Sequence, residues 1–88
     1  MMDRDSFSEA SRHNSILNLT FSESIRAIRQ AIVMVVGKFP DHIEGKLIQP
    51  HFFDSRLNWI VIPYSNITAV KSVSLKTYVK MKIDKMSQ

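Results

Sequence analysis

The sequence predicts a small α+β domain in which one amphipathic helix packs on an antiparallel sheet of three to five strands. Residues 21–35 repeat apolar side chains at helical spacing, whereas residues 73–83 alternate apolar and polar side chains at strand spacing. Between residues 42 and 70 the other apolar runs are only a few residues apart, and parallel crossovers need a dozen or more. We therefore expect antiparallel strands, in a sheet that is either open or rolled into a small barrel.

The size and composition of the chain are those of one globular domain. At 88 residues it would bury only about 60–65% of its unfolded surface, which is too little for two cores. Hydrophobic residues make up 44% of the chain and charged residues 23%, which excludes a disordered protein. The absence of cysteine excludes a disulfide framework and a thiolate zinc site. We expect a flexible tail at residues 1–14 and a single α+β domain at residues 15–88.

No segment has the pattern of a targeting signal or a membrane span. Residues 1–14 contain three acids, two arginines and no apolar run, unlike a secretory or transit peptide. No run reaches the roughly 18 apolar residues that a transmembrane helix needs. We therefore expect a cytoplasmic protein with no membrane partner.

The first regular element is predicted to be a helix over residues 21–36. A capping box at Thr20-Phe-Ser-Glu23 begins it, and Gly37 and Pro40 end it. Its apolar stripe steps along the chain by four, three, four and three residues, at Phe21, Ile25, Ile28, Ile32 and Val35. This face of the helix is expected to pack on the sheet.

A competing interpretation concerns the second half of the same stretch. Ile32–Val36 is rich in β-branched residues, which favour a strand. The helix would then end near Gln30, and a strand would run over residues 31–39. If the stretch is helical instead, Val33 and Met34 lie outside the apolar stripe and become candidates for contact with a partner.

Two shorter strands and a lead-in segment are predicted before the long alternating run. Residues 42–49 form the first, which Pro50 closes. Residues 58–63, with the sequence NWIVIP, are the most apolar run and are placed at the centre of the sheet, where both faces are covered. Residues 67–70 lead toward the run at 73–83.

The alternating run 73–83 is predicted to be a long strand with one apolar and one basic face. At roughly 3.3 Å per residue it would extend about 35 Å and could pair along the whole domain. Its basic face comprises Lys76, Tyr78, Lys80 and Lys82. Two interpretations of this face stay open. The lysines would bind phosphates while Tyr78 stacks on a base, or they would keep an exposed edge strand from pairing with other strands.

We expect a small, non-enzymatic nucleic-acid-binding protein, with RNA or DNA as its ligand. From residue 71 onward the chain carries five lysines and one acid, a balance that attracts phosphates. The candidate contact residues are Lys71, Lys76, Tyr78, Lys80 and Lys82, together with Arg26 and Arg29. The alternative is a protein-interaction regulator or a homo-oligomer, which would act through Val33, Met34, Trp59 or the edge of the last strand.

Catalytic and metal chemistry are not expected. The residues that could suggest a metal site are His42, His51, Asp41, Glu44 and Asp54, but the nine-residue separation of the histidines matches no zinc-ligand spacing. We interpret all five as solvated loop residues. The chain has no activated serine motif, phosphate-binding loop or dinucleotide fingerprint, so we expect neither enzymatic activity nor a cofactor.

Two short motifs, Gly45-Lys-Leu47 and Phe53-Asp-Ser-Arg-Leu-Asn58, resemble the first motif of the Sm-like RNA-binding barrels. The frame around them, with a helix first and Ile62-Pro-Tyr-Ser-Asn-Ile67 after the third strand, is similar to small bacterial YolD-like proteins. The resemblance covers residues 20–70 and implies a small β-barrel in which Asp54 and Asn58 contact an RNA base. Through the YolD-like proteins it implies a role beside translesion DNA polymerases.

Overall fold

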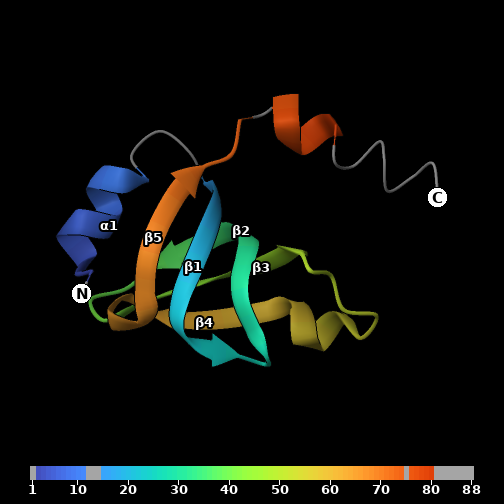
Figure 1. Ribbon diagram of the computed structural model, residues 1–88, viewed down its shortest axis with the longest axis horizontal. Coiled ribbons are helices and arrows are strands. Elements are labelled where there is room, and N and C mark those ends of the chain that lie inside the picture. The colour runs from blue at the N-terminus through green and yellow to red at the C-terminus, as the bar shows by residue number, and fades with distance from the viewer. Residues whose placement is uncertain (1, 12–14, 75, 81–88) are drawn as a thin grey trace.

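The computed structural model describes residues 2–11, 15–74 and 76–80 (Figure 1). In chain order the elements are α1 (Arg4–Ala10), β1 (Ile16–Ile25), β2 (Ile28–Lys38), β3 (His42–Gln49), η1 (Ser55–Asn58), β4 (Trp59–Pro63), η2 (Tyr64–Asn66) and β5 (Ile67–Ser72), where η denotes a 3-10 helix. Residues 76–80 form one further helical turn. Within the described ranges, no helix is both long enough and apolar enough to cross a membrane.

The strands form one antiparallel sheet in the order β4-β3-β2-β1-β5. The predicted α+β class, with a helix on an antiparallel sheet, is confirmed. β4 and β5 lie at opposite edges of the sheet, yet only η2 separates them in the chain. The four spacings of a flat five-stranded sheet would put its edges about 19 Å apart, whereas the four Cα steps across η2 span at most about 15 Å. The sheet therefore curls, but it stays open and is not a closed barrel (Figure 1).

Residues 21–36 lie in the β1–β2 hairpin, so the predicted helix is wrong. The side chains of Leu17, Leu19 and Phe21 are buried at alternate positions of β1, which is the period of a strand. β2 covers most of the competing strand at residues 31–39, so that interpretation is closer to the structure.

The hairpin turns without glycine at Arg26 and Ala27, whose φ angles are 52° and 66°. The left-handed conformation costs a residue with a Cβ roughly 1–2 kcal/mol, whereas glycine adopts it freely. Ala27→Gly is therefore expected to raise the free energy of unfolding by roughly 0.5–1 kcal/mol in urea denaturation. Ala69→Gly on β5 is the control and should lower it. An Ala27→Gly variant as unstable as this control would contradict the turn geometry.

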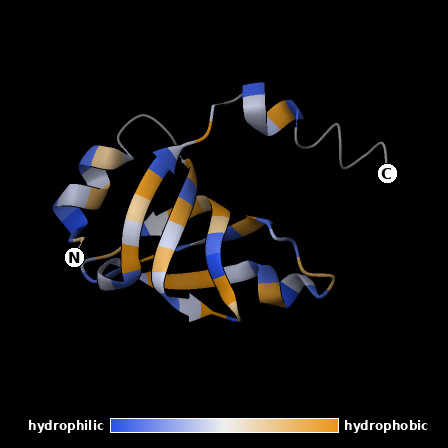
Figure 2. Ribbon diagram, in the orientation of Figure 1, coloured by the Kyte–Doolittle hydropathy of each residue, from blue (hydrophilic) through white to orange (hydrophobic). Residues whose placement is uncertain are grey.

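One core unites the strands, η2 and α1. Figure 2 shows apolar residues concentrated on the strands, where they alternate with polar ones. The fully buried large side chains are Phe7, Leu17, Leu19, Phe21, Val33, Ile43, Ile60, Ile62 and Ile67. Tyr64 of η2 is also buried, and burial raises the pKa of its hydroxyl.

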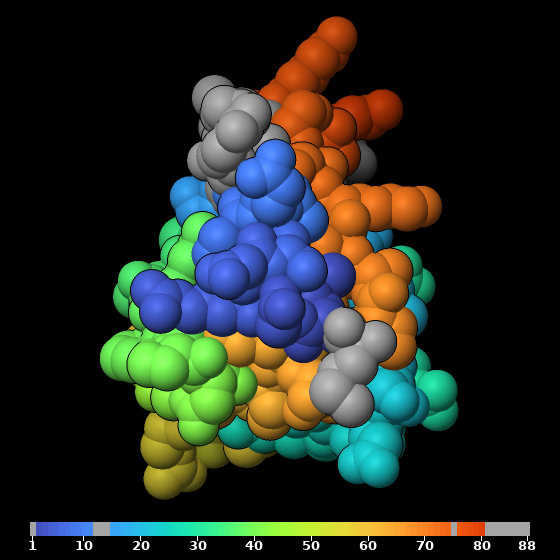
Figure 3. All heavy atoms as spheres, turned by 90° about the vertical axis from the view of Figure 1, so that its left-hand side faces the viewer, coloured from blue at the N-terminus to red at the C-terminus, as the bar shows by residue number. Residues whose placement is uncertain are grey.

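Helix α1 belongs to this core, although it falls within the segment predicted to be a flexible tail. Phe7 is fully buried, and its ring centroid lies 5.4 Å from that of Tyr64. The carboxylate of Asp3 accepts a hydrogen bond from the Ser6 amide (2.8 Å), which caps the helix and lowers the pKa of Asp3. In Figure 3, α1 lies between β5 and the β2–β3 turn, and Lys38 at the end of β2 reaches the Phe7 ring (5.8 Å to its centroid).

Among the shorter strands, β3 spans residues 42–49 as predicted. β4 begins one residue later than predicted, and its placement at the sheet centre is wrong because it lies at an edge. Ile60 and Ile62 of β4 are fully buried on one face, whereas Trp59 and Val61 are exposed on the other.

The predicted long strand over residues 73–83 is wrong in its described part. β5 ends at Ser72, and residues 76–80 are helical. Positions 75 and 81–83 of the predicted strand lie outside the described residues.

The strand ends because it has no further partner. The β1–β5 ladder stops at the pair Leu17 and Ser72, since β1 itself begins at Ile16. Ser74 then starts the helical turn, and its hydroxyl oxygen accepts a hydrogen bond from the Thr77 amide (3.1 Å). Local helical hydrogen bonds thus satisfy backbone that has no neighbouring strand.

Candidate interaction surface

The two edges of the sheet are protected differently. β5 carries the exposed Lys71, and α1 lies beside it in Figures 1 and 3. Charged side chains and covering elements are common means of keeping an edge strand from pairing. β4, with the sequence WIVIP, has no charged residue of its own, but the Arg26 side chain bonds to the Trp59 carbonyl on its outer side and Pro63 offers no amide there.

Hydrogen bonds at the start of β3 fix which of its backbone groups face β4. The His42 carbonyl accepts a hydrogen bond from the Phe39 amide on the β2 side (2.8 Å). The Asp41 carbonyl accepts one from the Tyr64 amide on the β4 side (3.2 Å). In an antiparallel strand the amide and carbonyl of one residue point to the same side, and successive residues alternate. Odd-numbered residues of β3 therefore face β4.

This alternation identifies the unpaired backbone groups of β4. In the β3–β4 register the odd-numbered residues of β3 oppose Ile60 and Ile62, which therefore make the hydrogen bonds to β3. The backbone groups of Trp59, Val61 and Pro63 point away from β3, along the free side of the strand. We call this side, with the exposed side chains of Trp59 and Val61, the β4 edge.

One group of the β4 edge already has a partner within the chain. Arg26, at the tip of the β1–β2 hairpin, donates from Nη1 to the carbonyl of Trp59 (2.9 Å) and to that of Leu57 (2.7 Å). Proline has no N–H. The edge therefore offers the amides of Trp59 and Val61 as donors and the carbonyls of Val61 and Pro63 as acceptors.

Apolar side chains accompany these backbone groups on the outer face. Trp59 is 38% exposed and Val61 is 47% exposed. Leu57 and Phe53, which precede β4, are exposed as well. Four exposed apolar side chains thus lie within residues 53–61, and two of them, Trp59 and Val61, belong to β4 itself.

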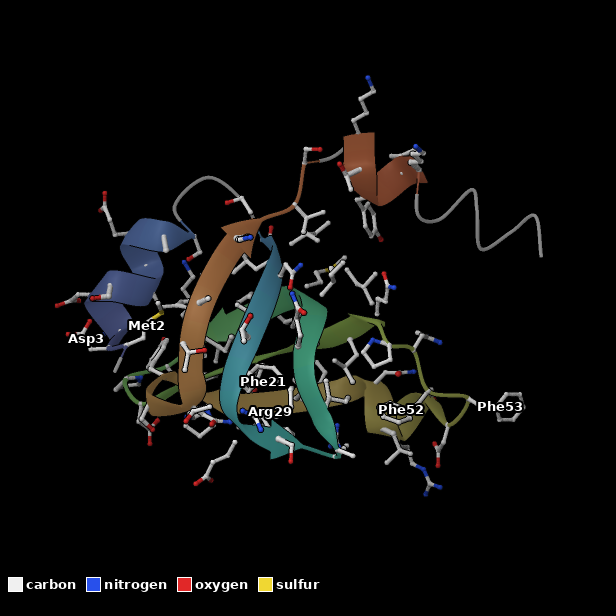
Figure 4. The ribbon with its side chains drawn as sticks, in the orientation of Figure 1. Met2, Asp3, Phe21, Arg29, Phe52 and Phe53 are labelled. Atoms are coloured by element: carbon white, nitrogen blue, oxygen red, sulfur yellow. The ribbon has the colours of Figure 1, made fainter. Side chains whose placement is uncertain are left out.

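The loop before β4 is held in place by Asn58, which is buried. Its side-chain amide accepts a hydrogen bond from the Phe52 amide (2.7 Å) and donates one to the Phe52 carbonyl (2.9 Å). Arg56 pairs with Asp54 (2.9 Å), and this hydrogen bond holds the pKa of Asp54 below its ordinary value. Phe52 packs on the core, while Phe53 points away from the domain at the loop tip (Figure 4). Asp54 and Asn58, named by the resemblance as base contacts, both organise this loop.

The residues predicted to bind nucleic acid do not share one strand face. Lys71 is exposed on β5, whereas Lys76 and Lys80 are exposed on the helical turn that follows. Tyr78 of the same turn is half-buried. Lys82 lies outside the described residues.

The other predicted contact residues have mixed positions. Arg29 donates from Nε to a β1 carbonyl (3.4 Å), so both predicted arginines, Arg26 and Arg29, bind backbone within the domain. Val33 is fully buried, which rules it out as a contact for a partner. Met34 is half-buried, and Trp59 is exposed at the β4 edge.

His42 lies beside two carboxylates at the β2–β3 turn. Its Nδ1 is 2.5 Å from Asp41 Oδ1, and its Nε2 is 3.9 Å from Glu44 Oε1. The hydrogen bond to His42 holds the pKa of Asp41 below its ordinary value. In the part of the chain that the structure describes, no group of three His, Asp or Glu side chains could hold a metal ion.

No protein-family model, curated protein or solved structure matches this chain. The candidate site is therefore defined by its geometry. The sequence singled out Trp59 but not Val61, because residues 58–63 were assigned to the sheet centre. The available signal was an apolar run without a charge, which is typical of a central strand and of a binding edge alike.

Proposed function

We propose that this protein is a non-enzymatic protein-interaction module whose partner adds a strand along the β4 edge. The observation that carries the proposal is the coincidence of unpaired backbone groups with exposed Trp59 and Val61 side chains on one strand. Each backbone hydrogen bond to an added strand would contribute roughly 0.5–1.5 kcal/mol to the free energy of binding. Covering the two side chains would contribute about 25 cal/mol per Å² of apolar surface.

The surroundings of β4 favour binding because they fix the strand beforehand. Arg26 holds the carbonyls of Leu57 and Trp59, and Asn58 holds the loop that precedes them. Ile60 and Ile62 anchor the inner face in the core. A partner would therefore lose little free energy to ordering this edge.

Site-specific photo-crosslinking can test this proposal by comparing the two edges of the sheet. The full chain would carry benzoyl-phenylalanine at position 61 on β4 or, as the control, at position 69 on β5, both of which are exposed. After irradiation in cells that express the chain, adducts would be identified by mass spectrometry. We expect a defined protein adduct at position 61 and none at position 69. Equal crosslinking at both positions, or none at 61, would overturn the proposal.

Nucleic-acid binding is a second candidate, supported by the distribution of charge. Residues 55–83 contain no Asp or Glu, and the exposed Lys71, Lys76 and Lys80 lie within this stretch. Unopposed lysines attract phosphates from a helix as well as from a strand. RNA or DNA would be held mainly by its backbone.

A paired charge change tests the second candidate. If Lys76 and Lys80 bind phosphates, changing both to glutamine should flatten the slope of log K against log salt by about 1.4 units on a single strand. Fluorescence anisotropy with a mixed-sequence single-stranded oligonucleotide measures this slope. The control changes Lys38 and Lys46, both exposed, to glutamine and removes the same charge elsewhere. If both variants lose the same amount of salt dependence, binding depends on net charge alone, and residues 76–80 do not form the site.

A further inference from the structure

We infer that the end of the β1–β2 hairpin is a strap that closes over the outer side of β4, and that a partner strand pairs with β4 when this strap opens. The strap comprises residues 23–26, which are the last part of β1 and the first residue of the turn. The contact is autoinhibitory, because the chain's own hairpin lies where the partner would bind. The inference rests on the proposed function and adds the regulation of the same site.

Hydrogen bonds place the strap beside η2 and β4. The Asn66 side chain of η2 accepts a hydrogen bond from the Glu23 amide (2.7 Å) and donates one to the Glu23 carbonyl (3.0 Å). Three residues later, Arg26 Nη1 donates to the Trp59 carbonyl (2.9 Å), which points away from β3. Residue numbers rise along the strap while those of its neighbours fall from 66 to 59. The strap therefore runs antiparallel to β4, along its outer side.

Side chains rather than a backbone ladder hold the strap to β4. In the order β4-β3-β2-β1-β5, the hydrogen-bonded neighbours of β1 are β2 and β5, and the β1–β5 ladder ends at Phe21, before the strap begins. The strap stays joined to β2 through the pair Ile25 and Ile28 and so moves with the hairpin turn. The bonds from Asn66 and Arg26 are exposed, so water can replace them. Opening thus breaks few hydrogen bonds and leaves the sheet intact.

The backbone of the hairpin provides a hinge and a bias toward opening. The β1–β2 register shifts between Thr20 and Ile25, and a strand bends where its ladder is irregular. Arg26 and Ala27 have φ angles of 52° and 66°, which residues with a Cβ keep only when surrounding contacts fix them. The Arg26 hydrogen bonds supply such contacts. Breaking them allows the turn to relax.

Arg26 competes directly with a partner strand. In an antiparallel ladder, the outward-pointing Trp59 carbonyl would accept a hydrogen bond from an amide of the added strand. Arg26 Nη1 already bonds to this carbonyl and occupies the space that the added backbone needs. After Arg26 is released, Ile60 and Ile62 still anchor β4 in the core, and Asn58 still holds the preceding loop. The open state is therefore an ordered edge, whereas the closed state excludes the partner.

Crosslinking from position 61 tests the strap when Arg26 is removed. Benzoyl-phenylalanine would be placed at position 61 in the wild-type chain, in Arg26→Ala and in Arg29→Ala. Arg29→Ala is the matched control, because Arg29 is an exposed arginine of the same hairpin but bonds to a β1 carbonyl (3.4 Å). We expect Arg26→Ala to raise the adduct yield by about threefold or more, since a larger fraction of the chain is open, and Arg29→Ala to leave it unchanged. A yield that does not rise in Arg26→Ala, or that rises equally in both variants, would overturn the inference.

Hydrogen exchange of the purified full chain tests the strap without a partner. The Glu23 amide should exchange about tenfold faster in Arg26→Ala than in the wild type, because the strap opens more often. The Leu19 amide, where β1 is paired on both sides, should keep its rate and so report an intact sheet. If no variant forms an adduct at position 61, the proposed function fails, and the Glu23 rate alone decides whether the strap opens. Equal adduct yields in the wild type and Arg26→Ala, with an unchanged Glu23 rate, would leave the proposed function standing and remove the strap.

Discussion

Phe7→Ala is expected to lower the free energy of unfolding by about 3–5 kcal/mol. Phe7 is the buried residue of α1, and its ring packs on Tyr64 and lies near the ammonium group of Lys38. Removing the ring leaves a cavity at the contact between the helix and the core. A small domain has a total stability of roughly 5–15 kcal/mol, so much of it would be lost. Urea denaturation followed by fluorescence of Trp59, the single tryptophan, measures the change.

Phe53→Ala is the matched control, because it removes the same side chain from a fully exposed loop tip. Its free energy of unfolding should stay within about 0.5 kcal/mol of the wild-type value. If Phe7→Ala were tolerated equally well, residues 2–11 would be the loose tail that their sequence suggests, and α1 would not be part of the core.

Ile62→Ala is expected to cost about 2–5 kcal/mol of unfolding free energy, because Ile62 is fully buried on the inner face of β4. Val61→Ala, one residue away on the outer face, should cost less than about 1 kcal/mol. Urea denaturation of both variants measures the two costs. Similar costs at the two positions would mean that both faces of β4 are covered, as in a central strand.

The apolar stripe at residues 21–35 predicted a helix wrongly, because the buried side chains of an irregular hairpin can also recur at helical spacing. The β1–β2 register shifts between Thr20 and Ile25, and beyond the turn Ile28 and Ala31 are both buried although they are three residues apart. The turn itself lacks the Asn-Gly signal that marks a two-residue hairpin. The β-branched composition of Ile32–Val36 was the better guide, because it reflects strand geometry locally.

The sequence predicted a strand correctly where turn-forming residues mark both of its ends. β3 was predicted at residues 42–49, the bounds it has in the structure, because prolines at 40 and 50 and a turn sequence delimit it. The position of β4 at an edge depends on which strands pair, and its apolar sequence is compatible with either place. The run 73–83 has the alternation of a strand, but β1 is too short to pair with it.

The candidate site was harder to predict from the sequence than the fold, because it too depends on which strands pair. The β4 edge is defined by which backbone groups remain unpaired, and that depends on the whole strand order. Arg26 was predicted to bind phosphate from a helix, but in the hairpin it reaches the Trp59 carbonyl, some thirty residues further along the chain. The sequence could indicate Trp59 as a contact, but not that its neighbour Val61 lies on the same open edge.

The connection through η2 also affects the order in which the sheet can assemble. β1 to β4 follow one another as a meander, whereas β5 must return to β1, where Thr68 bonds to Thr20 across 48 residues. Closing a loop of that length costs roughly 3 kcal/mol of chain entropy beyond that of a tight hairpin. β5 is also the last of the described strands to emerge from the ribosome. Until it docks, β1 has an unpaired edge of its own, so the growing chain is most exposed to misassociation at β1 rather than at β4.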